Sequence, residues 1–118
     1  MGVKPYDSKT LKARLEELAM ALPHEVTTRP MMGGFIGYAD GRPFVSLSTG
    51  GFGIKLLPDD QERLLKRDGA ERMRHLPDQP PSKTYISVGR DDLDDDGVMI
   101  EWLLIGAATA PTPKPRKR

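Results

Sequence analysis

The sequence contains no cysteine and no long apolar run. The lack of cysteine excludes disulfide bonds, thiolate metal ligands and cysteine nucleophiles. No apolar segment approaches the roughly 20 residues that a membrane-spanning helix needs. At the N-terminus, Lys4, Pro5, Tyr6 and Asp7 interrupt the apolar segment that a signal peptide requires. We therefore expect a cytoplasmic protein that does not contact a membrane.

The net charge is also small, +1 from 18 basic and 17 acidic residues. The last ten residues, TAPTPKPRKR, contain four basic residues and no acidic one. Because 18 less four leaves 14 basic residues against 17 acidic ones, positions 1–108 carry a charge of −3. A domain with this balance has no general attraction to a phosphate backbone. Electrostatic attraction to nucleic acid must come from the C-terminal residues or from a local patch.

Catalytic motifs are missing as well. No serine lies in a G-x-S-x-G pattern, and the glycine-rich stretches 33–37 and 50–53 lack the spacing and the following helix of a phosphate-binding loop. His24 and His75 are 51 residues apart, and no cysteine can complete a metal site with them. The sequence therefore predicts no catalytic residue, no metal site and no cofactor.

The acidic run DLDDDG, residues 92–97, matches the first half of a calcium-binding loop. The match fails at the twelfth position, where Leu103 replaces the bidentate glutamate and Glu101 comes two positions early. Because the N-terminus of a helix favours negative charge, we interpret these aspartates as the start of the last helix.

Three segments have the pattern of helices. A cap at Asp7 or Ser8 begins the first, which Pro23 ends. Asp59 and Glu62 resemble a capping box and predict a short second helix that stops at Gly69. The apolar positions of the first and last helices recur with a helical period. They are Leu11, Leu15, Leu18, Ala19 and Leu22 in the first helix and Val98, Met99, Trp102, Leu103 and Ile105 in the last.

Between the first two helices the pattern is that of strands, over residues 26–32, 35–39, 42–48 and 52–56. Glycines at positions 33–34, 41 and 50–51 mark the turns. Asp40-Gly41 is a preferred pair for a two-residue type I′ turn, because both positions need a positive φ. Residues 85–88 predict a further strand, and the proline-containing segment 70–83 predicts a loop with a brief strand near Met73.

These elements predict one α+β domain over residues 8–108. We expect an antiparallel β-meander with N-terminal, middle and C-terminal helices packed on one face. Residues 1–7 are expected to form a disordered leader, and residues 109–118 a disordered, proline-rich basic tail.

The central strands carry a family motif. Arg29 is followed by Met31-Met32-Gly33-Gly34, an apolar strand, Asp40-Gly41 and Pro43-Phe44. This order resembles the N-terminal domain of the TfoX/Sxy family of bacterial competence regulators, whose pattern is a basic residue, Met-Phe-Gly-Gly, a strand, Asp-Gly and Met-Phe. The resemblance covers residues 11–108. Full-length members carry a second, C-terminal domain, where this chain has the basic residues 109–118.

The resemblance implies a regulatory or interaction domain that works through a protein partner in transcription. No residue set supplies a nucleophile, a base and an oxyanion donor together, so we expect the domain to be non-enzymatic. We expect a monomer or a homodimer. For contact with the partner we expect the turn that contains Arg29, Met31, Met32, Gly33 and Gly34, together with exposed strand edges. Methionine has an adaptable side chain that suits a binding groove. Strand alternation instead predicts one of the two methionines in the core and the other outside.

Two alternatives stay open. The first is weak, non-specific DNA binding, in which Lys114, Arg116, Lys117 and Arg118 contact phosphates. No aromatic residue lies among them to stack on a base. The second is a small-ligand-binding domain or an enzyme with a pocket that the sequence does not reveal.

Overall fold

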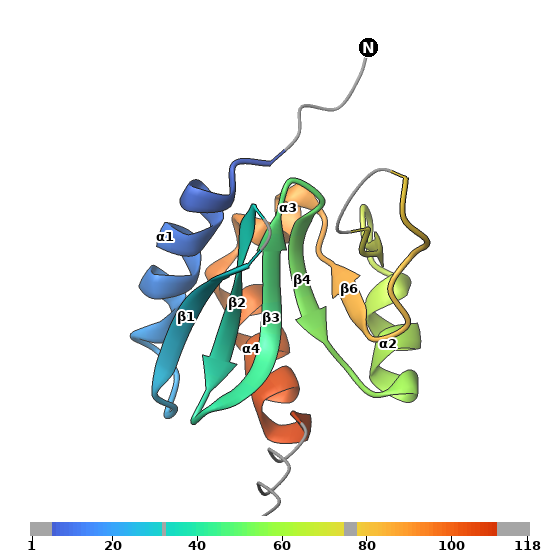
Figure 1. Cartoon of the computed structure of the whole chain (residues 1–118). Coiled ribbons are helices and arrows are strands. Elements are labelled where there is room, and N and C mark those ends of the chain that lie inside the picture. Colours follow the sequence, from blue (N-terminus) through green and yellow to red (C-terminus); the bar gives the residue numbers. More distant parts are fainter. Residues whose placement is uncertain (1–5, 32, 75–77, 111–118) are drawn as a thin grey trace, which may run out of the picture.

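The strands form one antiparallel sheet in the order β1-β2-β3-β4-β6-β5 (Figure 1). The computed structural model of the chain describes residues 6–31, 33–74 and 78–110. The first four strands form a meander, and β6 then pairs with the far side of β4. The strands are β1 (Val26–Met31), β2 (Gly34–Ala39), β3 (Arg42–Ser48), β4 (Gly51–Lys55), β5 (Glu71–Arg72) and β6 (Tyr85–Ser87).

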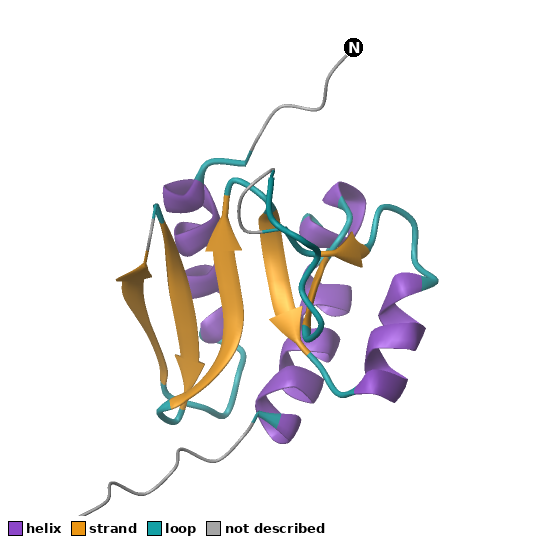
Figure 2. Ribbon diagram, turned by 45° about the vertical axis from the view of Figure 1, so that its right-hand side comes forward, coloured by secondary structure: helices purple, strands orange, loops and turns teal. Residues whose placement is uncertain are grey.

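The helices lie on one face of this sheet (Figures 1 and 2). They are α1 (Ser8–Ala19), α2 (Pro58–Leu65), α3 (Arg90–Leu93) and α4 (Asp96–Thr109). The prediction of an α+β domain, with a β-meander and helices packed on one face, is therefore confirmed. No helix in the described part of the chain is long and apolar enough to cross a membrane.

The core lies between the helices and the sheet. Because the leucines of α1 recur every three or four residues, they fall on one face of the helix and pack against the sheet. A Cβ at Gly106 in α4 would come 2.8 Å from Ile54 Cγ2, so this glycine lets α4 approach β4 closely. The largest completely buried side chains of this cluster are Leu15, Phe44, Leu47, Phe52, Ile54, Leu64, Ile86, Met99 and Leu103.

The predicted turns are confirmed. Asp40 and Gly41 have φ values of +52° and +81°, as a type I′ turn requires. Ser48 pairs with Gly51 across the next turn. Met31 pairs with Gly34 across the first turn, where Gly33 has a φ of +84°. Pro30 lies in β1, at the edge of the sheet. Its lack of an N–H therefore removes no hydrogen bond from the sheet.

Four predicted helix boundaries are wrong. α1 ends at Ala19, because Ala21 N and Leu22 N donate to carbonyl oxygens three residues earlier and tighten the chain before Pro23. α2 starts at Pro58 without a side-chain cap, so Asp59 is a first-turn residue and no capping box forms. α2 ends at Leu65, four residues before the predicted stop at Gly69.

At the C-terminal end, the acidic segment is not one helix start, because α3 precedes α4 and Asp94 separates them. Part of that prediction is confirmed, because Asp95 caps α4.

The two predicted disordered ends overlap the described residues. Tyr6 N donates to the carbonyl oxygen of Thr49 at 3.2 Å, and the Asp7 carboxylate caps α1. At the other end, Thr109 belongs to α4 and Ala110 is buried. The remaining residues of the predicted leader and tail, 1–5 and 111–118, lie outside the described residues.

The sheet face opposite the helices is partly covered by the segment that follows β5. Met73 is buried, and a Cβ at Gly53 in β4 would come 2.3 Å from its sulfur. Met73 N donates to the carbonyl oxygen of Tyr85, and Ser82 N donates to that of Met73. The brief strand predicted near Met73 is β5, one residue earlier.

Candidate functional site

An open groove of about 380 Å³ lies between the first turn of α1 and the β1–β2 hairpin. Three of the residues predicted to contact a partner, Met31, Gly33 and Gly34, line it. The described residues that line it are Ser8, Lys9, Pro30, Met31, Gly33, Gly34 and Phe35. The structure therefore brings the predicted turn together with a helix start that lies more than 20 residues earlier in the chain.

The groove is apolar on the hairpin side and polar on the helix side. Met31 is 51% exposed, and Phe35 is half-buried with Lys12 Nζ 5.7 Å from the centre of its ring. At the start of α1, Asp7 accepts hydrogen bonds from Thr10 Oγ1 and Lys9 N, at 2.9 Å and 3.2 Å. These bonds hold the pKa of the Asp7 carboxyl below its ordinary value, and the bond from Thr10 has the larger effect.

The two glycines of the motif have structural reasons of their own. Gly33 has a positive φ, a conformation that favours glycine. At Gly34 a Cβ would come 2.0 Å from the carbonyl oxygen of Leu47 in β3. Hairpin geometry therefore explains both glycines without any partner.

Arg29 does not line the groove. It pairs with Ile36, on the sheet face opposite the helices, and its Cζ lies 5.6 Å from the centre of the Tyr38 ring. A second cation–ring pair on this face joins Lys55 Nζ and Tyr85, at 5.8 Å. Burial and the neighbouring Tyr38 raise the pKa of Tyr85 to about 12. The predicted contact residues thus divide between two surfaces.

Several predicted residues lie outside the described residues. Met32 is one, so the choice between the core and a groove stays open for it. The four basic residues predicted to contact nucleic acid, Lys114, Arg116, Lys117 and Arg118, are the others. The DNA-binding alternative therefore stays a prediction from charge.

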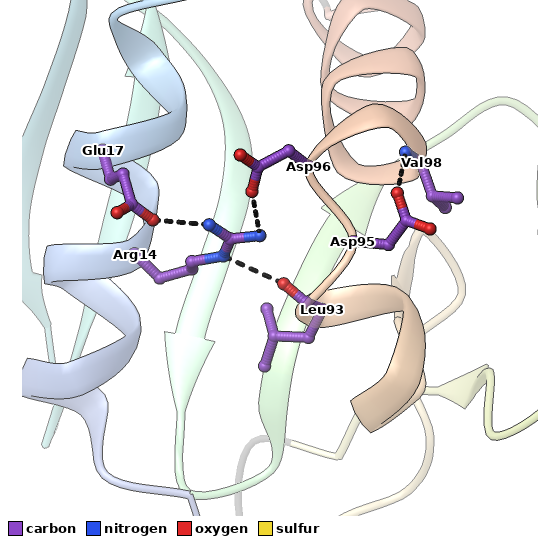
Figure 3. Close-up of polar contacts among 6 residues, drawn as sticks. All are labelled: Arg14, Glu17, Leu93, Asp95, Asp96 and Val98. Carbon is purple, nitrogen blue, oxygen red and sulfur yellow. Dashed lines mark hydrogen bonds and ion pairs between the residues drawn. The ribbon is translucent and has the colours of Figure 1, made fainter.

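Three carboxylates of the acidic run, those of Asp92, Asp95 and Asp96, are held by the chain's own donors. Asp95 Oδ1 accepts from Val98 N at 3.1 Å, and Asp96 Oδ1 lies 2.8 Å from Arg14 Nη2 (Figure 3). Asp92 accepts two hydrogen bonds from Arg67, at 2.7 Å and 3.1 Å, and these bonds raise the pKa of the Arg67 guanidinium. The run therefore caps α4 and ties it to the neighbouring elements.

Arg14 joins α1 to the segment between α3 and α4. Its Nε donates to the carbonyl oxygen of Leu93 at 2.9 Å, and Nη1 pairs with Glu17 (Figure 3). Burial opposes its charge, but the hydrogen bonds to Asp96 and Glu17 raise the pKa of Arg14 above its ordinary value. This buried connection is structural, because each of its polar contacts is internal to the fold.

His24 lies beside the hairpin turn, with Nδ1 2.7 Å from Asp40 Oδ2. The hydrogen bond with His24, followed by that from Glu25 N, lowers the pKa of the Asp40 carboxyl. His75 lies outside the described residues. Within the part of the chain that the structure covers, no three His, Asp or Glu side chains are placed to hold a metal ion.

The sequence reasoning missed Ser8, Lys9, Pro30 and Phe35 of the groove. Pro30 lies within the predicted turn, between Arg29 and Met31, and Phe35 follows it directly, so taking the whole stretch 29–35 as the site would have included both. Nothing local indicates Ser8 and Lys9, because their place depends on how α1 crosses the sheet. Comparisons of the chain with models of known families, with curated proteins and with solved structures find no match. The likeness to TfoX/Sxy N-terminal domains stays a prediction from the motif residues.

Proposed function

We propose that this protein is a cytoplasmic, non-enzymatic regulatory domain that works by binding a protein partner in transcription, and that the groove beside α1 is the contact site. The observation that supports the proposal is the meeting of the turn residues Met31, Gly33 and Gly34 in one open groove, where the side chains of Pro30, Met31 and Phe35 are apolar. Such a surface suits an apolar side chain on an extended segment of another protein.

The groove fits a protein segment better than a small molecule. Its volume of about 380 Å³ falls in the range of ligand sites, which are roughly 300–1,000 Å³. A ligand site also needs polar groups that converge on the ligand. Among the described residues, only Ser8 and Lys9 bring polar side chains to this lining, both from the same helical turn. The lining therefore favours an apolar contact that extends beyond the groove.

Site-specific photocrosslinking in cells tests this contact. A photoreactive amino acid replaces Met31 in one variant and Met20 in a control variant, because Met20 is 89% exposed and follows the opposite end of α1. We expect one discrete crosslinked protein from position 31 and none from position 20. Equal crosslinking at both positions would contradict a specific site.

Binding of the identified partner is then measured with purified proteins. Met31→Lys is expected to weaken binding at least about tenfold, since it places a charge against an apolar contact, whereas Met20→Lys leaves binding unchanged. If Met31→Lys bound the partner as tightly as the unmodified chain, the groove would not be the contact site.

A further inference from the structure

The outer side of β1 is a free strand edge. β1 is the first strand of the sheet, and no described strand pairs with its outer side (Figure 2). α1 packs across β1, β2 and β3, on the helical face, so it leaves this edge open. The opposite edge, β5, has only two residues. β1 is thus the long unpaired edge, and such edges accept a further strand.

The hydrogen-bonding phase of β1 follows from one bond. Asp40 N donates to the carbonyl oxygen of Glu25 at 2.8 Å, just before the first paired residue of β1. Because bonded and non-bonded pairs alternate in an antiparallel ladder, Thr27, Arg29 and Met31 bond to β2. The backbone groups of Val26, Thr28 and Pro30 therefore point outward. Pro30 has no N–H, so Val26 and Thr28 supply the outward donors of this strand.

We infer that two copies of this chain pair through β1, antiparallel, about a two-fold axis at Thr27. In this register Val26 N–H donates to the carbonyl oxygen of Thr28 of the second copy, and Thr28 N–H donates to that of Val26 of the second copy. The axis repeats both bonds, so all four outward donors of the two strands are used. Pro30, which has no N–H, lies outside these four hydrogen bonds and does not interrupt them.

Side-chain charges select the same register. Thr27 and Arg29 share the sheet face opposite the helices, because alternate residues of a strand point to the same side. Glu25 directly precedes β1, and its carbonyl oxygen accepts the bond from Asp40 N, so we extend the alternation to Glu25. About an axis at Thr27, Glu25 of each copy lies directly opposite Arg29 of the other. Cβ atoms of such pairs are about 4.5–5.5 Å apart, close enough for an ion pair.

Both charged side chains are available for this contact. Glu25 and Arg29 are exposed, and neither has an ion pair with another described side chain. The aromatic ring of Tyr38 beneath Arg29 holds the guanidinium over the sheet.

Neighbouring registers lack this match. An axis at Thr28 places Arg29 opposite Thr27 and Glu25 opposite Met31, so no opposite charges meet. An axis at Arg29 places two arginines opposite one another and sets the outward N–H of Thr28 against Pro30, which cannot return the bond. Only the register about Thr27 uses every outward donor and pairs both charges.

The dimer is tested by analytical ultracentrifugation of charge-reversal variants over a series of protein concentrations. Because β1 has only six residues, we expect its pairing to bury less than the ~1,600 Å² of a standard complex and to give a dissociation constant in the micromolar range. The loading concentrations therefore run from about 10 µM to about 1 mM. E25R and R29E each place like charges opposite one another, and each is expected to weaken the dimer at least about tenfold. The double variant E25R/R29E restores opposite charges and dimerises as the unmodified chain does.

The decisive experiment is ultracentrifugation of a mixture of the two single variants. One then carries acidic residues at positions 25 and 29 and the other basic residues, so the mixture is expected to form a heterodimer although neither variant dimerises alone. Thr28→Pro removes an outward donor that β2 does not use. It is expected to abolish the dimer with unchanged thermal unfolding of the monomer.

A monomeric unmodified chain at about 1 mM would overturn the inference, because micromolar binding predicts dimers there. So would single variants that dimerise normally, which would place the interface elsewhere. The dimer does not depend on the proposed partner, because Met31→Lys tests the groove and leaves positions 25 and 29 intact.

Discussion

Gly34 in β2 lies so close to Leu47 in β3 that a Cβ at residue 34 would come 2.0 Å from the Leu47 carbonyl oxygen. That oxygen belongs to the backbone of a central strand, so it cannot move aside without disturbing the sheet. Gly34→Ala is therefore expected to lower the free energy of unfolding by more than about 2 kcal/mol, measured by urea denaturation.

A matched glycine provides the control. Gly97 lies in the first turn of α4, where a Cβ would meet only Asp95 Oδ1, at an ordinary contact distance of 3.5 Å. Gly97→Ala is expected to leave stability unchanged or to raise it by about 0.5–1 kcal/mol, because alanine favours the helix. Equal losses in both variants would mean that the contact with Leu47 is not the cause.

The connection made by Arg14 predicts a second difference in stability. Arg14→Met removes the hydrogen bond to the Leu93 carbonyl and the ion pair with Asp96, and leaves the Leu93 carbonyl without that donor. Since the Arg14 side chain is only 16% exposed, we expect a loss of about 1–3 kcal/mol in urea denaturation.

Lys12→Met is the control for Arg14. Lys12 pairs with Glu16 along the exposed face of α1, at 2.9 Å, and exposed pairs of this kind contribute roughly 0.5 kcal/mol or less. Comparable effects of the two substitutions would contradict a structural role for the Arg14 connection.

The elements that the sequence predicts well are those decided by neighbouring residues. The hairpin turn is predictable at Asp40-Gly41, because a type I′ turn needs two positive φ values and few other residue pairs adopt them. The leucines of α1 share one face because of the helical period. The C-terminus of α1 and the start of α2 are less predictable, since proline permits more than one arrangement around it.

The groove and the cover over the second sheet face depend on tertiary packing. Ser8 meets the β1–β2 hairpin only because α1 crosses β1, β2 and β3 in one direction. Met73 is buried only because Gly53, in a strand 20 residues earlier, leaves space for its sulfur. Neither Ser8 nor Met73 lies in a local sequence pattern. Their positions in the fold therefore could not be predicted from a motif or from a hydrophobic period.

The Asp40 carboxylate predicts a dependence of stability on pH. Its folded pKa is lowered by the hydrogen bond with His24 and then by that from Glu25 N. Its stabilising effect is therefore complete above the unfolded value, near 3.9, and is lost as the pH falls through the lower folded value. The difference in melting temperature between the unmodified chain and Asp40→Asn is expected to be constant above about pH 5 and to shrink below pH 4.

Asparagine is the informative substitution at this position, because it accepts the positive φ of residue 40 and can still accept the bond from Glu25 N. A difference that stayed constant down to pH 2 would show that the charge of Asp40 does not stabilise the folded chain.

The basic residues at the C-terminus predict a test of the DNA-binding alternative. Fluorescence anisotropy with a labelled DNA duplex, over a series of salt concentrations, compares the full chain with a chain that ends at Ala110. If Lys114, Arg116, Lys117 and Arg118 make three or four phosphate contacts, the logarithm of the binding constant falls against that of salt with a slope of about −3 to −4. The shortened chain, with a charge of −3 over residues 1–108, is expected not to bind. Binding that survived the truncation would place DNA recognition in the folded domain and count against a protein partner as its main ligand.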